Sequence, residues 1–159
     1  MYLKPKIIVS RCLGFEPCRW NGKIIPSQAV EELKDNVEYV TVCPEADIGL
    51  GVPRNPIDLY DKEGDVRAIQ SCSGIDVTDR LRDYANYFLS QHKDVKGFIL
   101  KSRSPSCGNN TTRIHGRTSC GDGIFTYMIK TLMSNSIITD ETCLEEPRSK
   151  KLFLEKVSS

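Results

Sequence analysis

Three short runs of apolar, mostly β-branched residues are separated by longer segments with the pattern of amphipathic helices. The runs cover residues 6–10 (KIIVS), 39–43 (YVTVC) and 97–101 (GFILK). Continuous apolar runs of this length are typical of strands that are buried on both faces. Strands that alternate with helices predict a mainly parallel sheet with helices on both faces. We therefore expect an α/β protein with a Rossmann-like sheet.

The segments between these runs supply the other expected elements. Apolar residues at helical spacing predict helices over residues 28–34, with Ser27 as N-cap, from Asp76 or Thr78 to about His92, and over 122–134. Two short strands, 57–60 and 66–70, are expected to form a hairpin. A last short strand is expected at 137–138, followed by a C-terminal helix that is broken at Pro147. Nothing in the sequence divides the chain, so residues 1–159 are expected to form a single domain.

The charge of the chain is nearly balanced, with Lys+Arg 22, Asp+Glu 21 and a net charge of +1. Proteins that bind DNA stably gain much of their affinity by neutralising phosphates, so this balance argues against such a role. No apolar run approaches the roughly 20 residues of a membrane helix. Lys4 and Lys6 interrupt the stretch 1–10, which indicates a strand rather than the core of a signal peptide. We expect a cytoplasmic protein with no membrane partner.

The chain has seven cysteines, an odd number and a high count for a protein of a reducing compartment. Three of them follow predicted strands: Cys12 and Cys107 lie in the loops after two strands, and Cys43 ends another. Ligands of parallel α/β sheets bind outside the carboxyl ends of the strands, so these three thiols can converge. Thiolates are the usual ligands of iron–sulfur clusters. The alternative at this point is that three buried core cysteines happen to follow strands.

The residues beside these cysteines favour a chemical role. Glu45 places a carboxylate two residues after Cys43, and the segment 104–108 (SPSCG) surrounds Cys107 with two hydroxyls, a proline and Gly108. Backbone N–H groups and hydroxyls there could hydrogen-bond to cluster sulfides, and Gly108 would allow close approach of a bulky cofactor. Glu45 is a candidate general acid or base, with a salt bridge in a loop as its alternative role.

At these motifs the chain resembles the thiouracil desulfidase (TudS) family. The matching segments run in order along residues 10–14, 18–22, 43–45, 49–50, 53–56, 76–78, 104–108 and 121–123. The resemblance implies an oxygen-sensitive [4Fe-4S] cluster on Cys12, Cys43 and Cys107, with one open iron that acts as a Lewis acid. It also implies that sulfide is released from a thiolated nucleobase or nucleotide without net redox change.

Two further residues, Glu45 and Ser104, fall on positions that this family uses to handle the attacking water, so the resemblance implies that both are catalytic. The chain departs from the family between Cys107 and Gly121, where the family usually has a longer segment with a Tyr-Asp-Gly turn. That segment borders the expected site.

Three functions remain open from the sequence. The chain could be a desulfidase, a sulfur carrier that passes iron-bound hydrosulfide to an acceptor such as a tRNA thiolation enzyme, or a cluster- or zinc-binding protein without turnover. Cys18 or Cys72 as a fourth ligand would close the cluster and favour electron transfer or storage. Cys120 and Cys143 are expected to be packing cysteines.

Loops at the expected active edge also carry several cations. They are Arg19, Arg54, Arg103, Arg113 and Arg117. If several of them converge, they would form a pocket for a phosphate or carboxylate. His115 lies in the same group of loops and could face the substrate.

Overall fold

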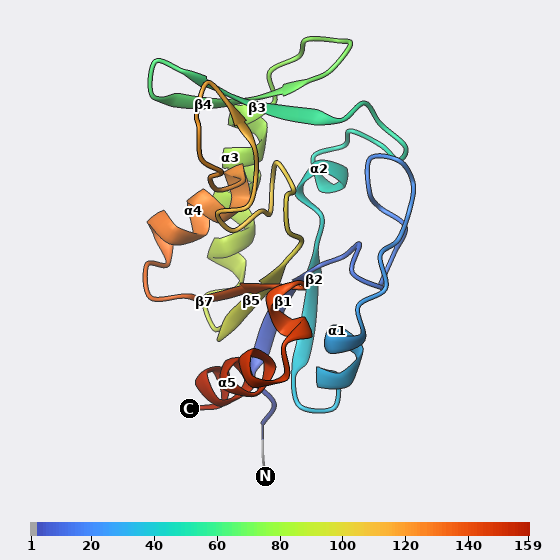
Figure 1. Cartoon of the computed structure of the whole chain (residues 1–159), viewed down its shortest axis with the longest axis vertical. Coiled ribbons are helices and arrows are strands. Elements are labelled where there is room, and N and C mark those ends of the chain that lie inside the picture. The colour runs from blue at the N-terminus through green and yellow to red at the C-terminus, as the bar shows by residue number, and fades with distance from the viewer. Residues whose placement is uncertain (1–2) are drawn as a thin grey trace.

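Four strands form a parallel sheet in the order β2-β1-β5-β7 (Figure 1). The computed structural model describes residues 3–159, so residues 1 and 2 of the strand expected over 1–10 lie outside the described residues. The strands are β1 (Lys6–Ser10), β2 (Glu38–Val42), β5 (Gly97–Leu100) and β7 (Ile137–Asp140). β1 and β5 occupy the centre, and every residue of β5 is buried. These are two of the runs whose continuous apolar sequence predicted strands buried on both faces.

Helices cover both faces of this sheet. One layer contains α1 (Gln28–Leu33) and α5 (Pro147–Ser158), and the other contains α3 (Thr78–Gln91) and α4 (Ile124–Leu132). Side chains alternate along β1, so Ile7 and Val9 belong to the core beneath α1 and α5, whereas Ile8 belongs to the core beneath α3 and α4. The predicted α/β architecture is confirmed.

The helix starts follow from local side-chain chemistry. Ser27 caps α1, because its Oγ accepts the N–H of Val30 at 3.3 Å, as expected. The helical C-terminus is interrupted just before Pro147: the 3₁₀ helix η1 (Cys143–Glu145) ends there, and Pro147 begins α5, with the carboxylate of Glu146 accepting the N–H groups of Arg148 and Ser149. A proline fits there because the first turn of a helix does not use that N–H group.

A second, smaller sheet has the order β4-β3-β6. The predicted hairpin forms it, with β3 (Ile57–Lys62) antiparallel to β4 (Asp65–Gln70). The third strand, β6 (Ile114–His115), pairs parallel with β3 and lies in a segment that was expected to be loop. In Figure 1 the hairpin crosses the top of the view, beyond the carboxyl ends of the main strands. Its buried residues pack on the first turns of α3.

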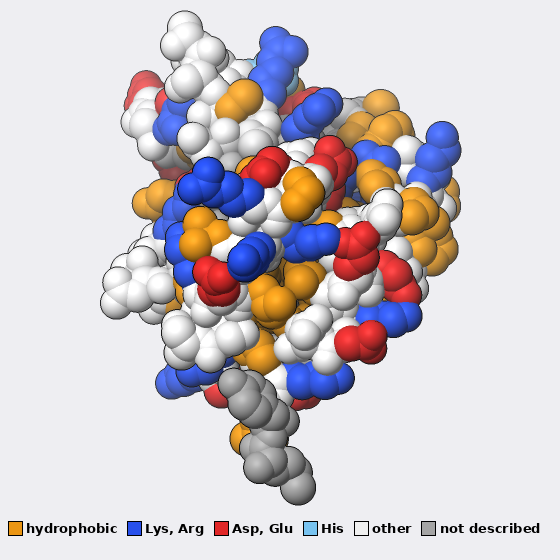
Figure 2. Space-filling model, turned by 60° about the horizontal axis from the view of Figure 1, so that its bottom comes forward, with side chains coloured by type: hydrophobic (Ala, Val, Ile, Leu, Met, Phe, Trp, Pro, Cys, Tyr) orange, Lys and Arg blue, Asp and Glu red, His pale blue; other side chains and the backbone are white. Residues whose placement is uncertain are grey.

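The charged side chains are mixed in sign over the face that Figure 2 shows, where Lys and Arg are interspersed with Asp and Glu. Several cations of the chain pair locally; Arg67, for example, pairs with Asp65 at 3.2 Å and with Asp76 at 2.8 Å. Among residues 3–159, no helix combines the length and apolar character that crossing a membrane requires.

Candidate functional site

A pocket of about 460 Å³ opens at the carboxyl ends of the main strands. The residues that line it include Ser10 at the end of β1, Val42 at the end of β2, and residues that follow β5 and β7. Four buried cysteines line it as well, namely Cys12, Cys18, Cys43 and Cys107. The structure therefore brings the three thiols that the topological rule selected into one pocket.

A short helix and an ion pair hold the loops of Cys12 and Cys43 together. Helix α2 (Pro44–Asp47) begins directly after Cys43, in a segment that was expected to be loop. The two carboxylate oxygens of Asp47 accept from Arg11, at 2.8 and 3.2 Å, and Asp47 also accepts the N–H of Cys43 at 3.4 Å. Because Arg11 directly precedes Cys12, this bidentate pair fixes one thiol loop against the other.

The loop that carries Cys107 is tied to the main sheet and to α4. The N–H of Lys101 donates to the Oγ of Ser10 at 2.8 Å, which joins the end of β5 to the end of β1. Thr126 of α4 donates its hydroxyl to the carbonyl of Cys107 at 2.7 Å. A Cβ added at Gly123 would lie 2.4 Å from the carbonyl carbon of Ser106, so only glycine lets α4 approach the loop this closely.

Ser104 stabilises the same loop from within. Its Oγ accepts the N–H groups of Ser106 at 3.2 Å and Cys107 at 3.0 Å. Gly108 is required by the packing of the protein's own chain. A Cβ there would lie 1.9 Å from Oγ1 of Thr112, so the close approach is made by the protein's own chain.

Glu45 faces the pocket and is a buried salt-bridge partner at the same time. It is 7% exposed, and its Oε1 accepts from Nε of Arg54 at 3.2 Å while its Oε2 accepts from the hydroxyl of Ser106 at 2.9 Å. The Arg54 side chain is 3% exposed and also donates to the carbonyl of Cys18 at 2.9 Å. The ion pair and the hydrogen bond fix the orientation of the Glu45 carboxylate in the pocket.

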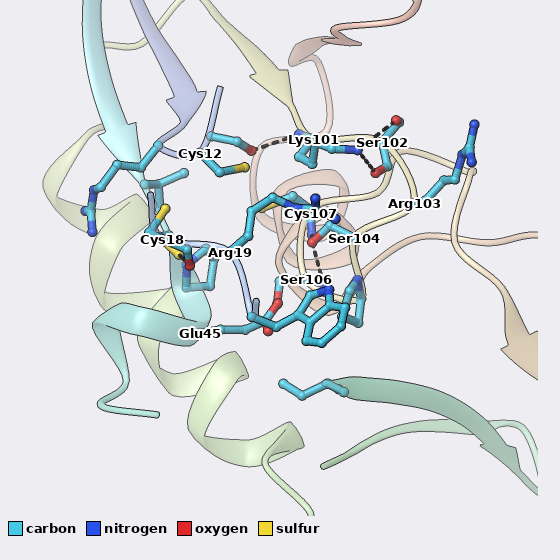
Figure 3. Close-up of a pocket in the computed structure, with 18 of the residues that line it drawn as sticks. Cys12, Cys18, Arg19, Glu45, Lys101, Ser102, Arg103, Ser104, Ser106 and Cys107 are labelled. Atoms are coloured by element: carbon cyan, nitrogen blue, oxygen red, sulfur yellow. Dashed lines mark hydrogen bonds between the residues drawn. The ribbon is translucent and has the colours of Figure 1, made fainter. Parts of the chain in front are cut away.

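A second buried carboxylate, Glu141, lines the same pocket and was missed by the sequence reasoning. Its Oε1 accepts the N–H of Ser102 at 2.7 Å, and its Oε2 accepts the Ser102 hydroxyl at 2.9 Å and pairs with Nζ of Lys101 at 3.0 Å. Glu141 directly follows β7, so the rule that selected the cysteines would also have found it. In Figure 3, Glu45 and Ser106 lie on one side of the thiols, and Lys101 and Ser102 lie on the other.

Three of the pocket thiols, those of Cys18, Cys43 and Cys107, have a raised pKa. Burial raises the pKa of Cys107 to about 12, and hydrogen bonding with the Cys12 thiol raises the pKa of Cys18 to about 11. Hydrogen bonding with Cys18, together with burial, raises the pKa of the Cys43 thiol above its ordinary value. Such thiols become thiolate ligands when a metal cation displaces their protons.

The donor set fits an iron–sulfur cluster better than a single ion. In the described part of the chain, no three Cys, His, Asp or Glu side chains are grouped closely enough to bind one metal ion. A multi-iron cluster is bulkier than one ion, so its ligands stand farther apart. Buried cysteines from separate strand ends, around a pocket of this size, are the ligand type that such clusters use.

Only some of the predicted site residues reach the pocket. Arg19, Arg54 and Arg103 line it. Arg113 and Arg117 do not, because they flank β6 in the second sheet, where Arg117 pairs with Asp61 at 2.7 Å.

His115 is also outside the pocket, because it belongs to β6 and pairs with the hairpin. Its ring stacks on Tyr60, with centroids 4.7 Å apart. The expectation that His115 faces the substrate was therefore wrong.

The remaining cysteines divide in a way that the sequence did not show. Cys18 is buried beside the other pocket thiols, whereas Cys72 is exposed and lies outside the pocket. Cys120 and Cys143 are exposed, so the prediction that they pack in the core was wrong. Cys120 lies in the loop before α4, and Cys143 begins the short 3₁₀ helix η1 (Cys143–Glu145), where only Leu144 is buried.

A parallel sheet covered on both faces, with thiols and a buried carboxylate in a pocket at its strand ends, defines an α/β protein with a thiol-lined active site. The model of the 2-thiouracil desulfurase family matches residues 7–141. The chain belongs to this family of enzymes, and the resemblance noted from its motifs is confirmed.

Two known proteins show the same relationship. The uncharacterized protein YbbK of Bacillus subtilis (strain 168) is 32% identical over 134 residues, which cover 78% of this chain and 89% of YbbK. The solved structure of the [4Fe-4S]-dependent thiouracil desulfidase TudS (DUF523Vcz) is 28% identical and superposes with a TM-score of 0.66. That match covers 94% of this chain and 97% of the TudS chain.

Proposed function

We propose that the chain is a [4Fe-4S] cluster-dependent desulfidase that releases sulfide from a thiolated nucleobase or nucleotide, such as a thiouracil, by hydrolysis of the C–S bond without net redox change. The observation that carries the proposal is the pocket that buried thiols from three strand ends line together with the buried carboxylate of Glu45. Membership of the 2-thiouracil desulfurase family and the likeness to TudS support it.

Cys12, Cys43 and Cys107 would hold the cluster. When bound, the cluster supplies an open iron that acts as a Lewis acid toward the sulfur of the substrate. In this assignment Cys18 is a neighbour of the ligands and not a ligand itself.

Glu45 is proposed to take a proton from the attacking water. Arg54 and Ser106 hold its carboxylate in place through bonds of 3.2 and 2.9 Å. Ser104 is proposed to orient the water. Because its Oγ already accepts two backbone N–H groups, its own hydrogen is left to donate into the pocket.

Two cations at the pocket support a substrate that carries an anionic group. Arg11, Arg54 and Lys101 are neutralised by Asp47, Glu45 and Glu141. Arg19 and Arg103 line the pocket and form no ion pair with any residue in the range 3–159. A guanidinium without a protein partner is suited to bind a phosphate, which supports the nucleotide form of the substrate.

The experiment that tests the proposal combines metal analysis with turnover. Anaerobically reconstituted protein should contain about four irons per chain and release sulfide from a thiouracil with no acceptor present. Cys12→Ala, Cys43→Ala and Cys107→Ala should each abolish the cluster, whereas Cys120→Ala and Cys143→Ala, at exposed positions, are the matched controls and should keep it.

Each outcome separates the alternatives. A full cluster in Cys43→Ala would overturn the ligand assignment. Sulfide transfer only when an acceptor protein is added would favour the sulfur carrier. A structure of the loaded protein with Cys18 on the fourth iron would close the cluster and contradict catalysis.

We also propose that the protein works in the cytoplasm as a single domain. All seven cysteines are free, as is usual in a reducing compartment. Helix α3 supports the single domain, because Ala85 and Leu89 pack in the core of the main sheet while Leu81 packs in the core of the second sheet.

A further inference from the structure

Trp20 is an exposed aromatic side chain at the proposed active site. It is 44% exposed and lines the pocket among residues that are mostly polar or thiol-bearing. It is the only tryptophan of the chain. An indole buries a large apolar area when it finds a partner, so an exposed indole at a pocket is well placed to contact a ligand.

The backbone around Trp20 is held in a fixed position relative to Glu45. The carbonyl of Trp20 accepts the N–H of Arg54 at 2.8 Å, and the guanidinium of Arg54 binds both Glu45 and the carbonyl of Cys18. The N–H of Gly22 donates to the carbonyl of Arg19 at 2.8 Å and closes the turn that contains Trp20. The indole therefore projects from an ordered turn, and Arg54 binds both this turn and Glu45.

Within residues 3–159, the aromatic ring of Trp20 has no stacking partner. The ring pairs of residues 3–159 join other side chains, for example Phe15 with Tyr39 and Phe88 with Phe125. The only cation placed over a ring in the same range is Lys62, over Tyr60. In the described part of the chain, no ring or cation thus competes for the π-system of Trp20 at the pocket.

We propose that Trp20 is the stacking platform for the substrate, on which the flat ring of a thiolated pyrimidine lies. This inference rests on the proposed function. It assigns to Trp20 the preference of the same site for aromatic rings over saturated ones. Stacking of a base on an aromatic side chain is worth roughly 1–3 kcal/mol. Because the stack contacts the ring and not the bond that breaks, Trp20 contributes to substrate binding and therefore to KM more than to kcat.

The test uses two probes that the enzyme does not desulfurise. Uracil has the aromatic ring without the sulfur, and 5,6-dihydrouracil keeps the same carbonyl and N–H groups on a saturated ring. Anaerobic equilibrium dialysis with the cluster-loaded enzyme gives the Kd of each probe for wild type, Trp20→Ala, Trp20→Leu and Trp20→Phe. Tyr87→Ala, which removes an exposed aromatic side chain far from the pocket lining, is the matched control.

Wild type should bind uracil more tightly than dihydrouracil. Trp20→Ala and Trp20→Leu should weaken uracil binding roughly 5- to 150-fold and dihydrouracil binding only slightly, while Trp20→Phe recovers most of the loss. The KM for thiouracil should rise in the same variants with kcat within a few-fold of wild type. Tyr87→Ala should leave both Kd values unchanged.

Equal weakening of both probes at full iron content would show that Trp20 only supports the loop, and unchanged binding of both would show that it makes no contact; either result overturns the inference. If wild type releases sulfide from thiouracil while the Kd of uracil is the same for wild type and the Trp20 variants, the proposed function stands and only this inference fails. If loaded wild type releases no sulfide and binds neither probe, the proposed function and the inference fail together.

Discussion

Two buried carboxylates line the same pocket, and they are held in different ways. Glu45 accepts only from side chains, one bond from Arg54 and one from Ser106. Glu141 accepts from three donors, and one of them is the backbone N–H of Ser102. A carboxylate has about four acceptor positions, so Glu45 keeps more capacity for a water molecule than Glu141 does.

Burial and an ionic partner do not by themselves mark a catalytic group. All bonds of Glu141 go to Lys101 and Ser102, which begin the loop that carries Cys107. Glu141 therefore stabilises the conformation of this loop, whereas Glu45 keeps acceptor positions for a water molecule, as its proposed role in the reaction requires. The same substitution at the two positions should separate these roles.

The largest effect is expected for Glu45→Gln. Glutamine keeps the size and one acceptor oxygen but cannot take a proton from water, so sulfide release should fall roughly 10²- to 10⁴-fold. Rates are measured on anaerobic protein with iron content matched to wild type, since a depleted cluster would mimic the loss. A wild-type rate in Glu45→Gln would contradict the proposed catalytic role of Glu45 and the functional difference between Glu45 and Glu141.

Glu141→Gln should act mainly on stability. The variant places an amide beside Nζ of Lys101 and leaves that partly buried cation without its charge partner, at a cost of about 1–3 kcal/mol in the free energy of unfolding. Urea denaturation followed by circular dichroism measures the change. A rate loss as large as that of Glu45→Gln, at full iron content, would mean that both carboxylates serve the reaction.

Ser104→Ala should have a smaller effect on the rate. It removes one proposed hydrogen bond to water and the two bonds that Ser104 accepts within its loop, so we expect a rate loss of up to roughly tenfold. Steady-state sulfide release at matched iron content checks this. If the variant instead loses iron, Ser104 has a structural role in the Cys107 loop, like the role given to Glu141.

The smallest effect is expected at Glu146, a fully exposed carboxylate that caps α5. Bonds from the side chain of Ser149 and from backbone N–H groups lower the pKa of Glu146 below its ordinary value. A lowered folded-state pKa means that this contribution to stability is present above the unfolded-state pKa and is lost as the pH falls through the folded-state pKa. Urea denaturation from pH 7 to pH 3 should therefore show that wild type loses its advantage over Glu146→Gln only in the acidic range. A constant difference across that range would contradict the linkage.

The features of the fold that could be predicted are those that depend on local sequence patterns. Continuous apolar runs gave the central strands, and the order of strands and helices gave the parallel sheet whose edge gathers Cys12, Cys43 and Cys107. β6 was missed because two residues are too few to show a period, and its pairing with β3 placed His115 away from the pocket.

The features that could not be predicted depend on side-chain surroundings. The position of Glu141 directly after β7 could have marked it as a pocket residue, but its role could not be predicted, because it depends on Lys101 and Ser102, which approach it from another strand end. The exposure of Cys120 and Cys143 likewise depends on how their loops lie on the surface, because the same small side chain suits a core as well.

The hydrogen bond between Ser10 and Lys101 joins residues that are 91 positions apart, and it has a consequence for the timing of assembly. During synthesis Cys12 and Cys43 are made well before Cys107, and domains generally fold as units once enough of the chain has emerged. Pairings between distant segments are slow, because the chain entropy is lost before the contacts form. The three thiols can therefore become neighbours only after β1 and β5 have paired, so the thiol pocket is complete only once the segment that carries Cys107 has been synthesised and has folded.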